Sequence, residues 1–326
     1  MAMYLGNKKV AVTNTIEKQV PSMKAFFEAG GKCVYSEVQS FNGLIKYEDT
    51  SNLYSMYRLF ENCKQLESIP LLDTSKVTSM QSTFGYCEYL TSIPDFNTPN
   101  LNSLNHTFTF CIRLKKAPNI STVKVTNWYG AFYQCKSITE LNLETQSATD
   151  MRETFSNCGS LVKVSLSNVS KVLSFDRIFQ DCINLKEVSG LETTYGNFTM
   201  NQMFSGCKAL VNAPMVNLSE VKSTSQMFYG CSSLVNVPIY DLTSVTDTSY
   251  MFSYCSNLET IHMININTNL DIHASTKFTR EALLEIIGNL KAQTSGSKKL
   301  TMGSTNLAKL TDEDKAIATN KGWTLA

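Results

Sequence analysis

Ten cysteines are the most reactive side chains in this chain of 326 residues, and nine of them are regularly spaced. Each of the nine follows a phenylalanine in the pattern F-x-x-C, and successive cysteines lie 23 to 25 residues apart. The phenylalanines are Phe60, Phe84, Phe108, Phe132, Phe155, Phe179, Phe204, Phe228 and Phe252. The cysteines are Cys63, Cys87, Cys111, Cys135, Cys158, Cys182, Cys207, Cys231 and Cys255.

This cysteine column could bind metal, form disulfides or pack as free thiols. Zinc sites use ligand pairs such as C-x-x-C, which are missing, so zinc would have to be bound between repeats. Disulfides between neighbouring repeats are within reach, yet stacked side chains point alongside rather than toward each other. No export signal is visible, which favours reduced thiols. We therefore expect buried free thiols that act as small hydrophobes, and no metal site.

Catalytic equipment is not visible in the sequence. The three histidines, His106, His262 and His273, have no nucleophile at a recognisable spacing, and no nucleophile-elbow or phosphate-loop motif is present. The acidic run Asp312–Asp314 is better explained as the favourable N-terminus of a helix. A calcium loop would need a glycine and a distal glutamate that are missing. The sequence therefore predicts a protein that is not an enzyme and has no cofactor.

The cysteine motif belongs to a longer repeat, F-x-x-C-x-x-L-x-x-[IVLA], that occurs nine times. The aliphatic position three residues after each cysteine is occupied by Leu66, Leu90, Leu114, Ile138, Leu161, Leu185, Leu210, Leu234 and Leu258. A period near 24 residues fits one strand plus a turn or short 3₁₀ segment per coil. Since one coil cannot bury its apolar face alone, the coils must stack, with phenylalanine on phenylalanine.

Segments such as TFGYCEYLTSIP, MFSGCKALVNAP and MFYGCSSLVNVP resemble the BspA-like leucine-rich repeats of bacterial surface proteins, over about residues 53 to 264. The resemblance implies an α/β solenoid: a right-handed stack with one short parallel strand per repeat, helical caps at both ends and a role in surface adhesion. The chain departs from the ordinary leucine-rich repeat, because residues such as Thr74, Thr98 and Leu218 replace its asparagine column.

An open stack needs a cap at each end, which suggests three regions. We expect an N-terminal cap at residues 1–50, with a strand at KKVAV and a helix between Pro21 and Gly30, and a solenoid at 51–268. A helix and strand cap at 269–326 should contain helices that begin after Thr279 and Thr311, each followed by a strand. The alternative for residues 269–326 is a separate functional domain.

Strand alternation predicts which residues of the solenoid face outward. If the motif leucine and the residue three positions later point inward, the residues two and four after the leucine point outward. Prolines in the second of these columns should shorten the strands near both ends of the array. The middle coils lack these prolines, so we place the candidate binding surface on Glu140, Asn142, Glu144, Lys163, Ser165 and Glu187. The alternative is that these charges only support one another across coils.

A further column, six residues after the leucine, is also expected to point inward, although simple alternation would send it outward. It consists of Leu72, Phe96, Ile120, Val216, Tyr240 and Ile264.

The near-zero net charge excludes some classes of binding partner. With 29 basic and 28 acidic residues, the chain has no charge that would attract nucleic acid or an anionic membrane, and no segment long enough for insertion. We expect a recognition or adhesion protein that binds a protein or glycan on a cell surface, or neighbouring virion proteins. A missing export signal and the opening MAMYLGNKKVAV favour a phage tail over a bacterial surface. The alternative is a structural spacer that contacts itself or a scaffold.

Overall fold

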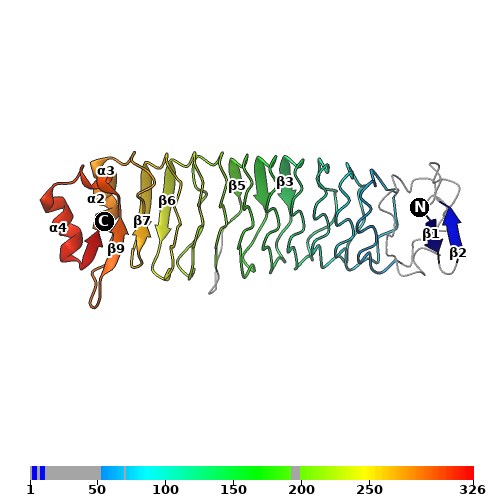
Figure 1. The fold of residues 1–326 in the computed structure, drawn as a ribbon. Coiled ribbons are helices and arrows are strands. Elements are labelled where there is room, and N and C mark those ends of the chain that lie inside the picture. Colours follow the sequence, from blue (N-terminus) through cyan, green and yellow to red (C-terminus); the bar gives the residue numbers. More distant parts are fainter. Residues whose placement is uncertain (1, 6–7, 12–52, 70, 192–198) are drawn as a thin grey trace.

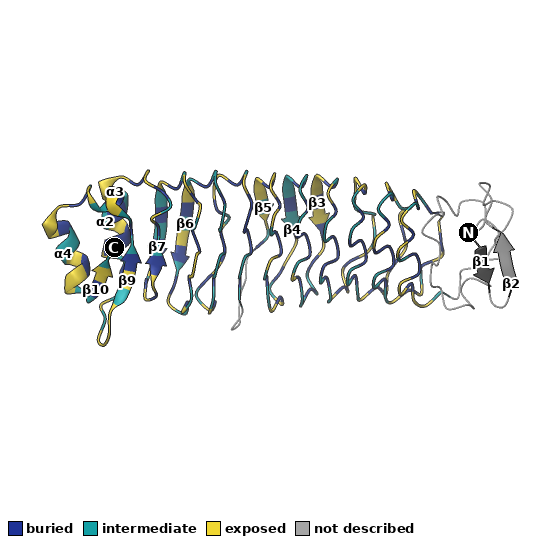
Figure 2. Cartoon of the chain, in the orientation of Figure 1, coloured by how far each residue is buried: buried dark blue, intermediate teal, exposed yellow. Residues whose placement is uncertain are grey.

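The computed structural model describes residues 2–5, 8–11, 53–69, 71–191 and 199–326, the first two ranges by backbone alone. The repeats form an elongated rod of stacked coils, with the N-terminus at one end and the C-terminus at the other (Figure 1). One continuous core runs along the rod, and buried residues recur along its described coils (Figure 2). This is the repeat solenoid that the spacing of the motif predicts.

Phenylalanine rings form the axis of the core. Neighbouring rings, from Phe60–Phe84 to Phe228–Phe252, are stacked with centroids 5.3 to 5.9 Å apart. All nine rings are at most 1% exposed. Rings at this distance and in near-parallel planes stabilise each other beyond the area they bury.

The motif cysteines form a second column beside the rings. Eight of them are free and buried. The thiol of each donates a hydrogen bond to the carbonyl of the phenylalanine in the preceding coil, with sulfur to oxygen distances of 3.0 to 3.2 Å. Cys63 differs from the expected free thiol, since it is disulfide-bonded to a partner outside the described residues. Cys63 belongs to the first copy of the motif. The phenylalanine carbonyl that accepts from each later thiol therefore has no counterpart in an earlier copy.

Two successive turns carry the chain past each phenylalanine. In the first coil, Leu59 N–H donates to Met56 O and Cys63 N–H donates to Phe60 O, both at 3.1 Å. The third residues of these turns, Arg58 and Asn62, have positive φ angles of 53° and 64°, as type II turns require. Turns rather than 3₁₀ segments therefore form this side of the coil. Other N–H groups donate to carbonyls of the next coil, as that of Phe60 does to Thr83 O.

The strands lie along another side of the rod. β3 (Glu140–Leu143), β4 (Lys163–Leu166) and β5 (Glu187–Ser189) form one parallel sheet, and β6 (Asn236–Asp241) and β7 (Thr260–Ile264) form another. The expectation of one strand per repeat is wrong for the described parts of the coils at Leu66, Leu90, Leu114 and Leu210. In three of these coils Pro94, Pro118 and Pro214 remove a backbone donor.

The register also shifts between β6 and β7. Val237 pairs with Ile261, but Tyr240 pairs with Met263, so β6 carries one extra residue in the bulge that contains Pro238. Met263 therefore takes the buried position opposite Tyr240, and Ile264 is 37% exposed. The predicted inward column is correct at Leu72, Phe96, Val216 and Tyr240, half-buried at Ile120 and wrong at Ile264.

Helices and a third parallel sheet follow the last coil. The helices are α2 (Arg280–Gly288), α3 (Ser304–Leu307) and α4 (Asp312–Asn320). The sheet has the order β10-β9-β8, from Trp323–Leu325, Lys298–Thr301 and Leu270–Asp271. Thr279 and Thr311 cap α2 and α4, and Asp314 completes a capping box.

An ion pair joins α2 to α4 in this C-terminal segment. Arg280 binds both carboxylate oxygens of Asp314, at 2.7 and 2.8 Å. The arginine and the amide of Thr311 hold the pKa of Asp314 below its usual value.

The N-terminal end is described only in part. β1 (Ala2–Leu5) and β2 (Lys8–Ala11) pair as antiparallel strands, and β2 contains the expected KKVA strand. The helix expected between Pro21 and Gly30 lies outside the described residues.

Candidate functional site

The six residues proposed as a binding surface lie on or next to the sheet β3-β4-β5. Glu140, Lys163 and Glu187 are direct neighbours across the three strands, and Asn142 lies opposite Ser165. Glu140, Asn142, Glu144 and Glu187 are exposed, while Lys163 and Ser165 are half-buried. The fold therefore brings all six to one face of the middle coils.

Part of this surface is internally paired. Lys163 Nζ lies 2.8 Å from Glu187 Oε1, and a hydrogen bond to this carboxylate raises the pKa of Lys163. Ser189 Oγ donates to Ser165 Oγ at 3.2 Å. Lys163 and Glu187 therefore support each other across coils, as the alternative interpretation of these charges predicts. The other three residues, Glu140, Asn142 and Glu144, lie on or next to β3, the edge strand of the sheet. The free side of β3 is the edge that faces away from β4.

A groove of about 680 Å³ opens beside that free side. It is lined by three successive coils, at Asp95–Thr98, Lys116–Thr122 and Glu140–Glu144. Its floor reaches the core side chains Leu104, Trp128 and Phe132. Three of the six predicted residues thus line the groove, whereas Lys163, Ser165 and Glu187 do not.

The groove exists because two neighbouring coils do not pair on this face. Thr139 O and Leu143 O accept from Val162 N and Ser167 N, so these carbonyls point toward β4. Alternation along a strand then directs the backbone groups of Glu140 and Asn142 toward the groove. No backbone hydrogen bond joins β3 to the stretch 116–120, all of which the structure describes.

A small side chain deepens this opening. The inward column contains Ile93, Ala117 and Leu141 in successive coils, so Ala117 leaves space where its neighbours have branched side chains. At the far end, Thr122 Oγ1 donates to Glu144 O at 2.8 Å and closes the gap. Sequence reasoning missed Asp95, Asn119 and the role of Ala117, although alanine occupies this apolar column only at Ala117 and Ala213.

We expect Ala117→Leu to fill the groove and stabilise the protein. Leucine occupies the equivalent position at Leu141, and filling an existing hollow commonly adds about 0.5–2 kcal/mol to the free energy of unfolding. Thermal unfolding followed by circular dichroism should show a higher Tm. A Tm lowered by several degrees would mean that the space is already occupied and that the groove is wrongly placed.

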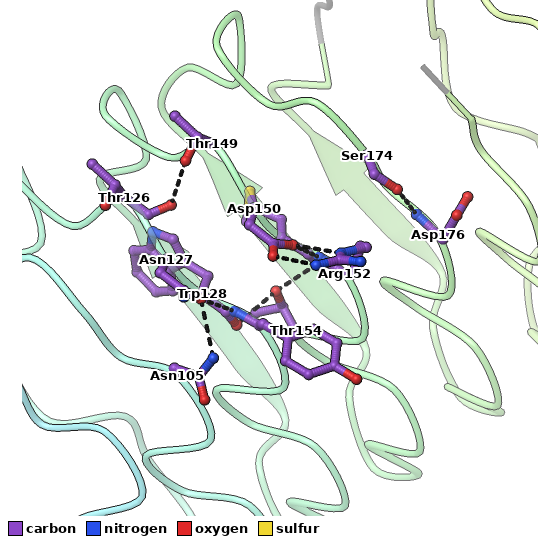
Figure 3. A network of polar contacts seen from close by, with 12 residues as sticks. Asn105, Thr126, Asn127, Trp128, Thr149, Asp150, Arg152, Thr154, Ser174 and Asp176 are labelled. Atoms are coloured by element: carbon purple, nitrogen blue, oxygen red, sulfur yellow. Dashed lines mark hydrogen bonds and ion pairs between the residues drawn. The ribbon is translucent and has the colours of Figure 1, made fainter. Parts of the chain in front are cut away.

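A second hollow, of about 410 Å³, lies around Asp150 on the following coils. Asp150 accepts two hydrogen bonds from the Arg152 guanidinium, at 2.7 and 3.0 Å, and one from the Arg152 amide (Figure 3). Asp176 accepts from Thr199 and from the amide of Asn201. Because these carboxylates are occupied by partners of the same chain, this hollow is the weaker candidate.

Asp150 belongs to a column of polar residues that recurs in every repeat. It lies five residues before each phenylalanine and comprises Ser55, Ser79, Ser103, Asn127, Asp150, Ser174, Thr199, Ser223 and Asp247. In eight of these nine, all except Thr199, the side-chain oxygen accepts from the amide two residues later. Small polar residues at this position in all nine repeats were the signal that sequence reasoning missed.

Metal-ligand clusters and membrane-spanning helices are both missing from the part of the chain that the structure describes. Across residues 53–69, 71–191 and 199–326, no three His, Cys, Asp or Glu side chains are arranged to hold a metal ion. None of the helices in these ranges is long and apolar enough to cross a bilayer. The His106 side chain is hydrogen-bonded to Thr109, with Nδ1 2.9 Å from Oγ1 of the threonine. Burial lowers the pKa of this histidine.

Comparison with solved structures finds similarity to leucine-rich repeat proteins. A leucine-rich repeat protein of T. pallidum is 24% identical over 48% of this chain and 70% of its own, with a TM-score of 0.37. One from Bacteroides ovatus is 16% identical over 83% and 86%, with a TM-score of 0.34. A leucine-rich cell surface protein of Faecalibacterium prausnitzii is 15% identical over 64% and 75%, with a TM-score of 0.32. No curated protein sequence matches.

One sequence family matches the repeats directly. The family described as "Mycoplasma protein of unknown function, DUF285" matches residues 22–144, 126–236 and 149–262. These overlapping matches contain all nine copies of the F-x-x-C motif and extend from residue 22 to residue 262. The chain therefore belongs to the DUF285 family.

Proposed function

We propose that this protein is a non-catalytic recognition protein of a cell surface, which binds a protein or glycan through the strand-bearing face of its middle coils. The observation that carries the proposal is the groove of about 680 Å³ beside β3, because it coincides with Glu140, Asn142 and Glu144. Surface location follows the resemblance to BspA-like proteins. The matches named above are cellular proteins, so the phage tail and its virion partners are not part of this proposal.

The rod architecture supports binding rather than catalysis. Its core residues repeat from coil to coil, while the outward residues of the strand face change from Lys116 to Glu140 to Lys163. A solenoid can therefore vary its surface without disturbing its stability, which is how repeat proteins build binding faces. The alternative function is a structural spacer. The Lys163–Glu187 ion pair favours it, because these two charges satisfy each other without a binding partner protein.

Charge reversal on the middle coils should separate these functions. We expect the triple variant Glu140→Lys, Lys163→Glu and Glu187→Lys to lose saturable binding to bacterial cells or glycan arrays, because it inverts the charges beside the groove. Its far-ultraviolet circular dichroism should be unchanged, since the Lys163–Glu187 pair is kept in reversed order. The matched control is Lys208→Glu, an exposed lysine elsewhere.

Equal binding by the triple variant and the unaltered protein would move the binding site away from this face. If neither protein binds any surface, while both self-associate in sedimentation experiments, the spacer function replaces recognition.

A further inference from the structure

The groove beside β3 combines an apolar floor with an acidic rim. Ala117, Ile120 and Leu141 line it from the core side, and the carboxylates of Asp95, Glu140 and Glu144 line its mouth. Such a lining suits a side chain with a long apolar stem and a charged end.

The balance of charge at the groove is negative. Lys116 is the one basic residue among those that line it, against three carboxylates. Lys163, which neighbours Glu140, is held by Glu187 at 2.8 Å, and Lys124 Nζ donates to Asn100 Oδ1 at 3.1 Å. None of the ion pairs in the described chain uses Glu140 or Glu144. A cationic group would therefore find two unpaired carboxylates on the β3 wall.

The backbone of β3 adds neutral acceptors to the same wall. The carbonyls of Glu140 and Asn142 point into the groove, because those of Thr139 and Leu143 are bound by the next coil. A free strand edge of this kind pairs with extended polypeptide. Carboxylates and carbonyls side by side suit the five donors of a guanidinium better than the compact ammonium of lysine.

From this geometry we infer that the groove receives an arginine side chain from an extended segment of a protein partner. The stem lies on Ala117 and Ile120, and the guanidinium donates to Glu140, Glu144 and the edge carbonyls of β3. The inference rests on the proposed recognition function and names its partner class: a basic, extended polypeptide rather than a glycan.

Two matched peptides test this directly on the full chain. One is the acetylated and amidated peptide Thr-Val-Arg-Val-Thr, and the other has citrulline, a neutral isostere, in place of arginine. Calorimetric titration at low salt should show binding of the arginine peptide and binding at least about tenfold weaker for citrulline, since charge-assisted hydrogen bonds are lost. Equal affinity would overturn the assignment of a cationic ligand.

Variants of the protein locate the site. Glu140→Gln combined with Glu144→Gln should weaken the arginine peptide about tenfold or more, and Ala117→Leu should abolish binding by filling the floor. Glu259→Gln, an exposed carboxylate that does not line the groove, should leave the affinity unchanged. Unaltered affinity in Ala117→Leu, or no binding of the arginine peptide at millimolar concentration, would overturn the inference.

Failure of the arginine groove can be distinguished from failure of the proposed recognition function. If the triple charge-reversal variant loses cell binding while Ala117→Leu retains it, recognition stands and the arginine groove does not. If the arginine peptide binds but no cell surface or glycan does, the groove stands and the surface partner is wrong.

Discussion

Raising the pH above about 9 should unfold this protein cooperatively. Burial is the main cause that raises the pKa of Cys158 and Cys255 from an ordinary value of 9.0 to about 12, and it raises the pKa of the other six free thiols of the column as well. The folded chain therefore keeps protons that the unfolded chain has already lost.

The direction of the effect follows from proton binding. Below pH 9 both states hold the thiol protons, so the column contributes its full stability. Between about pH 9 and pH 12 the unfolded state binds fewer protons, and each thiol lowers the free energy of unfolding by about 1.4 kcal/mol per pH unit. All eight free thiols shift in the same direction, so the free energy of unfolding should fall steeply as the pH rises above about 9.

Circular dichroism and thiolate ultraviolet absorbance, recorded together during an alkaline titration, would measure this transition. Both signals should change at the same pH, because a thiol can ionise only when its coil opens. Cys158→Ala is the matched control and should reduce the number of protons released on unfolding by one. Ionisation of the thiols near pH 9 with the circular dichroism unchanged would show that the column is accessible to solvent.

Truncating a ring in the middle of the stack should have the second largest effect. Phe155 is completely buried, and its ring lies 5.9 Å from that of Phe132 and 5.4 Å from that of Phe179. We expect Phe155→Ala to lower the free energy of unfolding by about 3–5 kcal/mol, through lost burial and the cavity left behind. Urea denaturation followed by circular dichroism measures the loss.

The control is Tyr250→Ala, because this tyrosine is 63% exposed. It should change stability by no more than about 0.5 kcal/mol. Since coils contact only their neighbours, hydrogen exchange in Phe155→Ala should accelerate first in the coils on either side. A loss of less than about 1 kcal/mol would contradict the packing of this ring at the centre of the core.

The helices after the last coil are the part of the fold where local sequence was most informative. Thr279 and Thr311, each followed by acidic residues in the first turn, indicate helix starts, and α2 and α4 begin directly after them. These signals work because a capping side chain bonds amides only three residues away. Cys63 is the opposite case, because its disulfide depends on a residue outside the repeat pattern.

The candidate site was only half visible in the sequence. Glu140, Asn142 and Glu144 could be placed outward by alternation, because side chains on a strand point to opposite faces at every step. Their association with Asp95 and Lys116 could not, since it depends on a gap between two coils. Alternation alone also could not show that Lys163 pairs with Glu187 while Glu140 remains unpaired.

By itself, then, the sequence determined the number of coils, the buried phenylalanine and cysteine columns and the helix starts after the last coil. Each is encoded in residues of one repeat or one turn, so each can be recognised without knowing the neighbours. Only the tertiary structure decided which coils pair as strands, where Ile264 points and where the groove opens. These features depend on the register between adjacent coils, which is set by a bulge at Pro238, a small side chain at Ala117 and missing ladder hydrogen bonds beside β3.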